Sequence, residues 1–128
     1  MAKSDKVAAV AELVERFRAA DAVLLTEYRG LTVGQLKQLR RGLAGNATYA
    51  VAKNTLARLA AKEVGLDFLA EDLKGPTAIA FVSGEPVEAA KTLRDFAKDN
   101  PALVLKSGAM DGAQLSAEGV KKLVDLVS

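Results

Sequence analysis

The clearest candidate site in this 128-residue chain is a basic window, residues 28–62, which contains no aspartate or glutamate. Its cationic side chains are Arg29, Lys37, Arg40, Arg41, Lys53, Arg58 and Lys62. Guanidinium and ammonium groups without acidic neighbours attract phosphate, and such a surface is typical of proteins that bind nucleic acids. The window therefore predicts a surface that binds a polyanion.

Two points in the window place a base directly before a predicted helix. Arg29 and Gly30 precede a helix whose start is indicated by Thr32, the first residue of a T-x-x-Q capping box. Lys53 precedes a second helix, for which we expect Asn54 to be the cap. Because a helix N-terminus exposes backbone N–H groups and the positive end of the macrodipole, we expect a phosphate at both turns.

The other bases of the window have a second interpretation. Lys37, Arg40 and Arg41 fall on one predicted helix, where three bases commonly form a solvated face without a partner. Arg58 and Lys62 lie four residues apart and would extend the Lys53 turn along one helix face. Both tyrosines of the chain also lie in the window, where they fit stacking on nucleotides and burial in the core equally well.

The elements that would position these residues alternate between helix and strand. Apolar runs predict strands over residues 22–28, 47–52, 77–82 and 103–107, and Gly108 with Gly112 predicts a turn. Helical periodicity predicts helices over residues 7–17, 31–44, 54–64, 86–99 and 116–127. Alternation alone favours a parallel α/β sheet, whereas four short strands also fit a two-layer α+β sandwich.

Composition narrows the possible function classes. The chain has no Cys and no His, which removes disulfides, thiolate metal sites and the commonest general base. No apolar run approaches the length of a membrane span, and the N-terminal sequence does not form a signal peptide, which favours a cytoplasmic location. We expect no catalytic residue, metal or cofactor. The alternative, a small enzyme or regulatory domain that binds a phosphorylated ligand at the same helix starts, lacks a nucleophile motif.

Charge is divided along the chain. Residues 1–63 hold 11 bases and 6 acids, a net charge of +5, and residues 64–128 hold 7 bases and 10 acids, a net charge of −3. The acidic half is open to two interpretations, a surface for a basic protein partner or a solvated surface turned away from the polyanion.

Three motifs follow one another at characteristic separations. They are E-Y-R-G-L-T at residues 27–32, V-A-K-N-T-L-A-R at residues 51–58 and G-P-T-A-I-A-F at residues 75–81. Together they resemble the bacterial large-subunit ribosomal protein L-ten family, and the resemblance covers essentially the whole chain. It implies an α+β fold, a two-layer sandwich of the α-β plait type with a four-stranded sheet and flanking helices. It also implies a single rRNA-binding domain over residues 1–128, without the C-terminal stalk-binding helix of the family.

The function that this resemblance implies is structural. Members of the family bind large-subunit rRNA at the stalk base, the GTPase-associated region, next to the ribosomal protein L-eleven. Through their C-terminal helix they anchor dimers of the acidic stalk proteins that recruit translation factors, and they can repress their own operon. The implied location is the large subunit of the cytoplasmic ribosome, with no membrane partner.

The resemblance also assigns rRNA contacts to particular turns and helix faces. Carried over by position, and completed by the basic window, the expected contact residues are Arg29, Gly30, Leu31, Lys37, Arg40, Arg41, Lys53, Asn54, Thr55, Arg58 and Lys62, with Lys3 and Lys6 at the start of the chain. The turn Gly75-Pro76-Thr77 is interpreted as structural, because Gly-Pro is a strong turn former.

Overall fold

The computed structural model describes residues 3–84, 86–110, 113–116, 119 and 122, with side chains described from Val7 onward except at residues 113 and 115. The helices are α1 (Lys3–Ala19), α2 (Val33–Leu43), α3 (Asn54–Glu63) and α4 (Pro86–Asp99), with a short 3-10 helix η1 (Asp67–Asp72). The strands are β1 (Ala22–Glu27), β2 (Ala47–Val51), β3 (Thr77–Val82), β4 (Val104–Met110) and β5 (Ala113–Ser116).

The strands form one antiparallel sheet in the order β2-β3-β1-β4-β5. The units β1–α2–β2 and β3–α4–β4 are each a split βαβ unit, and the two interleave so that each contributes the strand between the other's pair. This is the predicted plait, and the predicted α+β class is confirmed. The parallel α/β alternative is wrong, because every neighbouring pair of strands is antiparallel.

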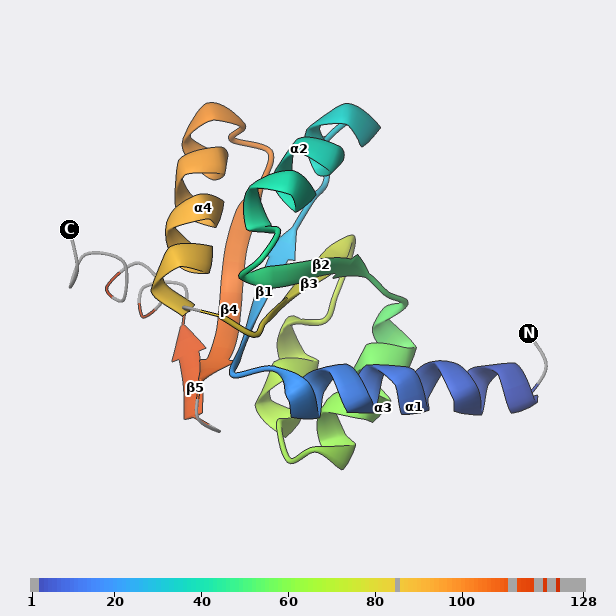
Figure 1. Ribbon diagram of the computed structural model, residues 1–128. Coiled ribbons are helices and arrows are strands. Elements are labelled where there is room, and N and C mark those ends of the chain that lie inside the picture. The colour runs from blue at the N-terminus through green and yellow to red at the C-terminus, as the bar shows by residue number, and fades with distance from the viewer. Residues whose placement is uncertain (1–2, 85, 111–112, 117–118, 120–121, 123–128) are drawn as a thin grey trace.

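Helices cover both faces of the sheet (Figure 1). On β1, Leu24 packs in the cluster formed with α2 and α4, whereas Leu25 packs in the cluster formed with α1, α3 and η1. Successive side chains of a strand point to opposite faces, so the central strands β1 and β3 need apolar residues on both faces, as residues 22–25 and 78–82 provide. The sheet with α2 and α4 makes the predicted two-layer plait, and α1 with α3 adds a further layer.

The sheet extends beyond the four predicted strands. Strand β4 runs to Met110, so its predicted end at residue 107 is wrong, whereas the reversal from β4 to β5 after Met110 lies within the predicted turn between Gly108 and Gly112. Gly108 is buried where β4 lies against β1, and a Cβ there would overlap the carbonyl oxygen of Val23. Ser116, the predicted start of a last helix, belongs instead to the edge strand β5, and most of the predicted helix 116–127 lies outside the described residues.

Candidate nucleic-acid interface

The ends of β1 and β2 and the start of β3 meet at one end of the sheet. Because β3 pairs antiparallel with both strands, Glu27 lies opposite Thr77, and Val51 lies opposite Ala78. The turns that follow β1 and β2, which carry Arg29 and Lys53, therefore flank the residues that lead into β3. The two turns predicted to bind phosphate are thus brought to one place, which we call the basic corner.

The centre of the basic corner is the Gly75-Pro76 turn. The side-chain amide of Asn54 donates to the carbonyl of Gly75 at 2.8 Å, and the N–H of Tyr28 donates to the carbonyl of Pro76 at 3.0 Å. The side chains of Glu27 and Arg29 lie against the same turn, since a Cβ on Gly75 would be 3.2 Å from Glu27 Oε1 and 3.4 Å from Arg29 Nη2. Sequence reasoning gave this turn only a structural role, and the strand register places it within the candidate interface.

The two helix starts at the corner differ in how their N–H groups are satisfied. The Thr32 capping box is confirmed, with Gln35 N–H donating to Thr32 Oγ1 at 3.1 Å and Thr32 N–H donating to Gln35 Oε1 at 2.9 Å. The prediction that Asn54 caps α3 is wrong, because Lys53 is the N-cap residue and the Asn54 side chain is engaged by Gly75. Among the described residues no side chain caps α3, so its first turn is the better anion site.

The turn from Arg29 to Leu31 is exposed at one end and packed at the other. The Arg29 side chain is 74% exposed, and its Nη2 lies 3.9 Å from the Glu27 carboxylate, a loose surface pair. Gly30 adopts φ +90°, a backbone conformation that favours glycine. A Cβ at this position would also lie 3.3 Å from the Cβ of Ala102. Leu31 is half-buried against the cluster under α2 and α4.

All three bases of α2 are exposed, and one of them is also anchored. Arg40 donates from Nε to the carbonyl of Tyr49 at 3.3 Å and so links α2 to the edge strand β2. Lys37 and Arg41 are exposed on the same helix. Both interpretations, a solvated face and a phosphate contact, therefore fit Lys37 and Arg41, whereas Arg40 also has a structural contact.

The remaining predicted contact residues lie at different distances from the corner. Thr55 and Lys62 are exposed on α3, but Lys62 is in its last turn, about 12 Å from Asn54 along the helix axis. Arg58 is half-buried and donates to the carbonyl of Leu73, which gives it a structural role. Lys3 and Lys6 are in the first turns of α1, and their side chains lie outside the described ones.

The two tyrosines of the window occupy different environments. Tyr49 is buried, and its hydroxyl shares a hydrogen bond with the hydroxyl of Thr26. Burial raises the pKa of Tyr49, and the Thr26 hydrogen bond and the Arg40 charge only partly offset that rise. Tyr49 is therefore a core tyrosine, whereas Tyr28 is half-buried and lies at the corner itself.

Lys106 is a basic residue of this region that sequence reasoning missed. From β4 its ammonium donates to the carbonyls of Lys74 at 2.6 Å and Asp72 at 3.1 Å, and to the hydroxyl of Thr77 at 3.1 Å. These acceptors flank the Gly75-Pro76 turn on both sides in the chain, so the hydrogen bonds of Lys106 stabilise the conformation of that turn. Lys106 lies outside the basic window, and the sequence around it does not indicate that it contacts the Gly75-Pro76 turn.

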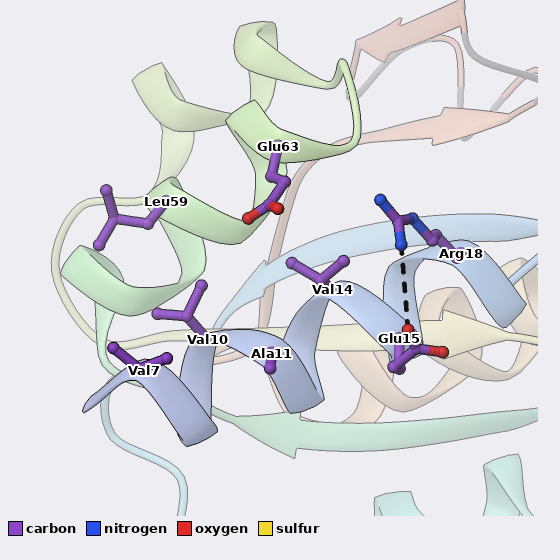
Figure 2. A pocket seen from close by; sticks show the side chains of 8 residues that line it. All are labelled: Val7, Val10, Ala11, Val14, Glu15, Arg18, Leu59 and Glu63. Carbon is purple, nitrogen blue, oxygen red and sulfur yellow. Dashed lines mark ion pairs between the residues drawn. The ribbon is translucent and has the colours of Figure 1, made fainter. Parts of the chain in front are cut away.

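Another hollow in the described part of the chain lies between α1 and α3, away from the basic corner (Figure 2). It has a volume of about 650 Å³ and is lined mainly by apolar side chains, among them Val10, Val14 and Leu59. At its rim Glu15 and Arg18 form a loose ion pair of 3.9 Å. Polar groups do not converge in it as they do in a catalytic pocket, so it gives no support to the enzyme alternative.

The described part of the chain offers neither a metal-binding cluster nor a membrane-spanning helix. Its acidic side chains form no group of three or more that could hold a metal ion. None of its helices combines the length and the apolar character that a membrane crossing needs.

Comparison with known proteins gives one consistent result. The family model described as Ribosomal protein L10 matches residues 1–98. The large ribosomal subunit protein uL10 of Streptomyces griseus subsp. griseus is 62% identical over 128 residues, which are 100% of this chain and 69% of that protein. The uL10 of Beutenbergia cavernae is 61% identical over the same 128 residues, which are 74% of its length. The chain therefore belongs to the ribosomal protein L10 family, the L-ten family that its motifs indicated.

Proposed function

We propose that this protein is a structural constituent of the large ribosomal subunit in the cytoplasm and that it binds rRNA at the stalk base through the basic corner. The observation that carries the proposal is the convergence of Arg29 and Lys53 on the Gly75-Pro76 turn. The names of the relatives support the ribosomal role and with it a function that is not enzymatic.

The geometry of the corner suits phosphate. Arg29 and Lys53 are both exposed, so neither is committed to the core, and the uncapped first turn of α3 adds backbone N–H donors. Lys37 and Arg41 on α2 would extend the contact along the RNA backbone. Arg40 and Arg58 would contribute mainly by fixing the elements that they join, since each donates to a backbone carbonyl.

The family resemblance adds further partners to the proposal. We propose contact with the neighbouring L-eleven protein, and anchoring of acidic stalk protein dimers through the C-terminal helix that follows the rRNA-binding domain in the family. Repression of the protein's own operon would use the same basic corner, because a messenger leader presents the same phosphate backbone.

The proposal is tested by measuring the affinity for a stalk-base rRNA fragment as a function of salt concentration. Each phosphate contact releases counterions, so Arg29→Gln and Lys53→Gln should each weaken binding and lower the slope of log affinity against log salt by about one unit. Lys98→Gln is the matched control, because Lys98 is an exposed lysine on α4, outside the basic corner. If all three variants bind with the wild-type affinity and slope, the basic corner is not the rRNA site.

A further inference from the structure

A small hollow opens at the basic corner between the end of β2 and the turn into β3. It has a volume of about 330 Å³ and is lined by Tyr28, Val51, Ala52, Lys53, Asn54, Gly75, Pro76 and Thr77. None of these eight described residues is acidic. Small-molecule sites in proteins have volumes of about 300 to 1,000 Å³, so this hollow has the size for one compact group.

The hollow is held in shape from several sides. Its floor, the Gly75-Pro76 turn, accepts hydrogen bonds from Asn54 and Tyr28, and Lys106 fixes the preceding carbonyls. Thr77 Oγ1 donates to the carbonyl of Lys74 at 2.9 Å, which closes the turn on itself. A ligand would therefore enter a preformed site and would not have to order the loop, which lowers the cost of binding.

The lining of the hollow combines apolar surface with hydrogen-bonding groups and a cation. Val51 is 45% exposed although it is a large apolar residue in a strand, and Pro76 and Tyr28 add flat apolar surface. The Asn54 amide donates through Nδ2 to Gly75, which leaves its Oδ1 as an acceptor. Lys53 contributes the cation to the lining, and it is the N-cap residue of α3, whose first turn has no side-chain cap among the described residues.

This combination matches the chemistry of a nucleotide. A planar base has two apolar faces and an edge of hydrogen-bonding groups, and its phosphate needs donors and positive charge nearby. Duplex RNA keeps its bases stacked inside the helix, so only an unpaired base could enter a hollow of this size.

From these observations we infer that the hollow accepts one unpaired nucleobase of a folded RNA, with the adjoining phosphate at Lys53 and the start of α3. The inference rests on the proposed rRNA binding and goes beyond it, because it gives the corner a contact that distinguishes unpaired from paired RNA. A free nucleotide carries the same chemical groups, so the test must separate the two sources.

The test uses the full chain and a stalk-base rRNA fragment in which each unpaired nucleotide is replaced, in turn, by an abasic one. We expect one abasic position to weaken binding by about tenfold, the size of a single base-stacking contact, with the salt slope unchanged because no phosphate is lost. In Val51→Thr the ratio between the intact and that abasic RNA should fall by about threefold, because the apolar contact is reduced while the shape is kept. Val104→Thr is the matched control, an exposed valine on β4 that is 48% exposed.

The outcomes separate this inference from the proposed function. Salt-dependent binding of the intact fragment, with every abasic RNA bound equally well, would overturn the nucleobase site and leave the basic corner in place. Absence of salt-dependent binding to any of these RNAs would overturn both. Adenosine and uridine 5′-monophosphates, added at millimolar concentration, should fail to displace the fragment, and displacement at micromolar concentration would assign the hollow to a free nucleotide instead. Equal effects of Val51→Thr and Val104→Thr would remove Val51 and the hollow from the contact.

Discussion

Replacing Lys106 by methionine tests whether the basic corner depends on support from outside the basic window. The ammonium donates to two carbonyls and one hydroxyl around the Gly75-Pro76 turn. Methionine keeps much of the apolar stem but leaves those three acceptors without their charged donor. A hydrogen bond to a charged group contributes about 1.5–3 kcal/mol, but Lys106 is only half-buried and water can replace part of the interaction. We therefore expect a loss of about 2 kcal/mol in the free energy of unfolding.

The measurements are denaturant unfolding and RNA binding over a range of salt concentrations. The loss in stability corresponds to a Tm decrease of roughly 8 °C for a chain of this size. Binding should weaken severalfold because the turn is less ordered, while the salt slope stays at the wild-type value, since Lys106 positions the turn and contacts no phosphate.

The matched control is Lys98→Met, an exposed lysine at the end of α4, which should change stability by less than about 0.5 kcal/mol. A salt slope lowered by one unit in Lys106→Met would identify Lys106 as a direct phosphate contact and refute the positioning role. Stability and affinity equal to those of the control would refute the support of the turn altogether.

Three further predictions concern the fold. Because burial raises the pKa of Tyr49 in the folded state, the unfolded state loses the proton first, so the contribution of Tyr49 to stability should be constant well below pH 10.0, the ordinary tyrosine pKa, and fall as pH rises toward the folded-state value. Unfolding curves of the wild type between about pH 8 and 12 should therefore show a fall that is smaller in Tyr49→Phe by that contribution. Gly108→Ala should lower stability by more than about 3 kcal/mol in thermal melting, because its Cβ would overlap the Val23 carbonyl oxygen, and a near-wild-type Tm would contradict the close packing of β4 on β1. Thr32→Ala should cost about 1 kcal/mol by loss of the capping box, with Thr32→Ser as the conservative control that retains it.

Much of the scaffold was predictable because its elements carry local signals. The apolar runs of β1 and β3, the T-x-x-Q box before α2 and the Gly-Pro turn before β3 each determine structure from a few neighbouring residues. Strand β5 was missed because its last residue, Ser116, was interpreted as the start of a helix. Strand β4 was predicted too short because Gly108 suggested a turn, whereas the structure uses that glycine for close approach of two strands.

The candidate site was predicted in part, and its gaps have a common cause. The two basic turns were identified because a base before a helix start is visible in the sequence. The contacts around the Gly75-Pro76 turn were not predicted, because they join residues that are distant in the chain. These contacts are the hydrogen bonds from Asn54 to Gly75 and from Lys106 to Lys74. The same long-range contact reversed the predicted role of Asn54, whose side chain was expected to cap its own helix. Strand pairing, which composition and spacing do not determine, decides these contacts.

Binding of rRNA through the basic corner is best tested by footprinting of large-subunit rRNA with and without this chain, repeated with the Arg29→Gln, Lys53→Gln double variant. We expect protection confined to the stalk base, present with the wild-type chain and with Lys98→Gln, and strongly reduced with the double variant because two phosphate contacts are lost. Protection at the stalk base that persists unchanged in the double variant, or protection spread over unrelated rRNA helices, would contradict rRNA binding through the basic corner.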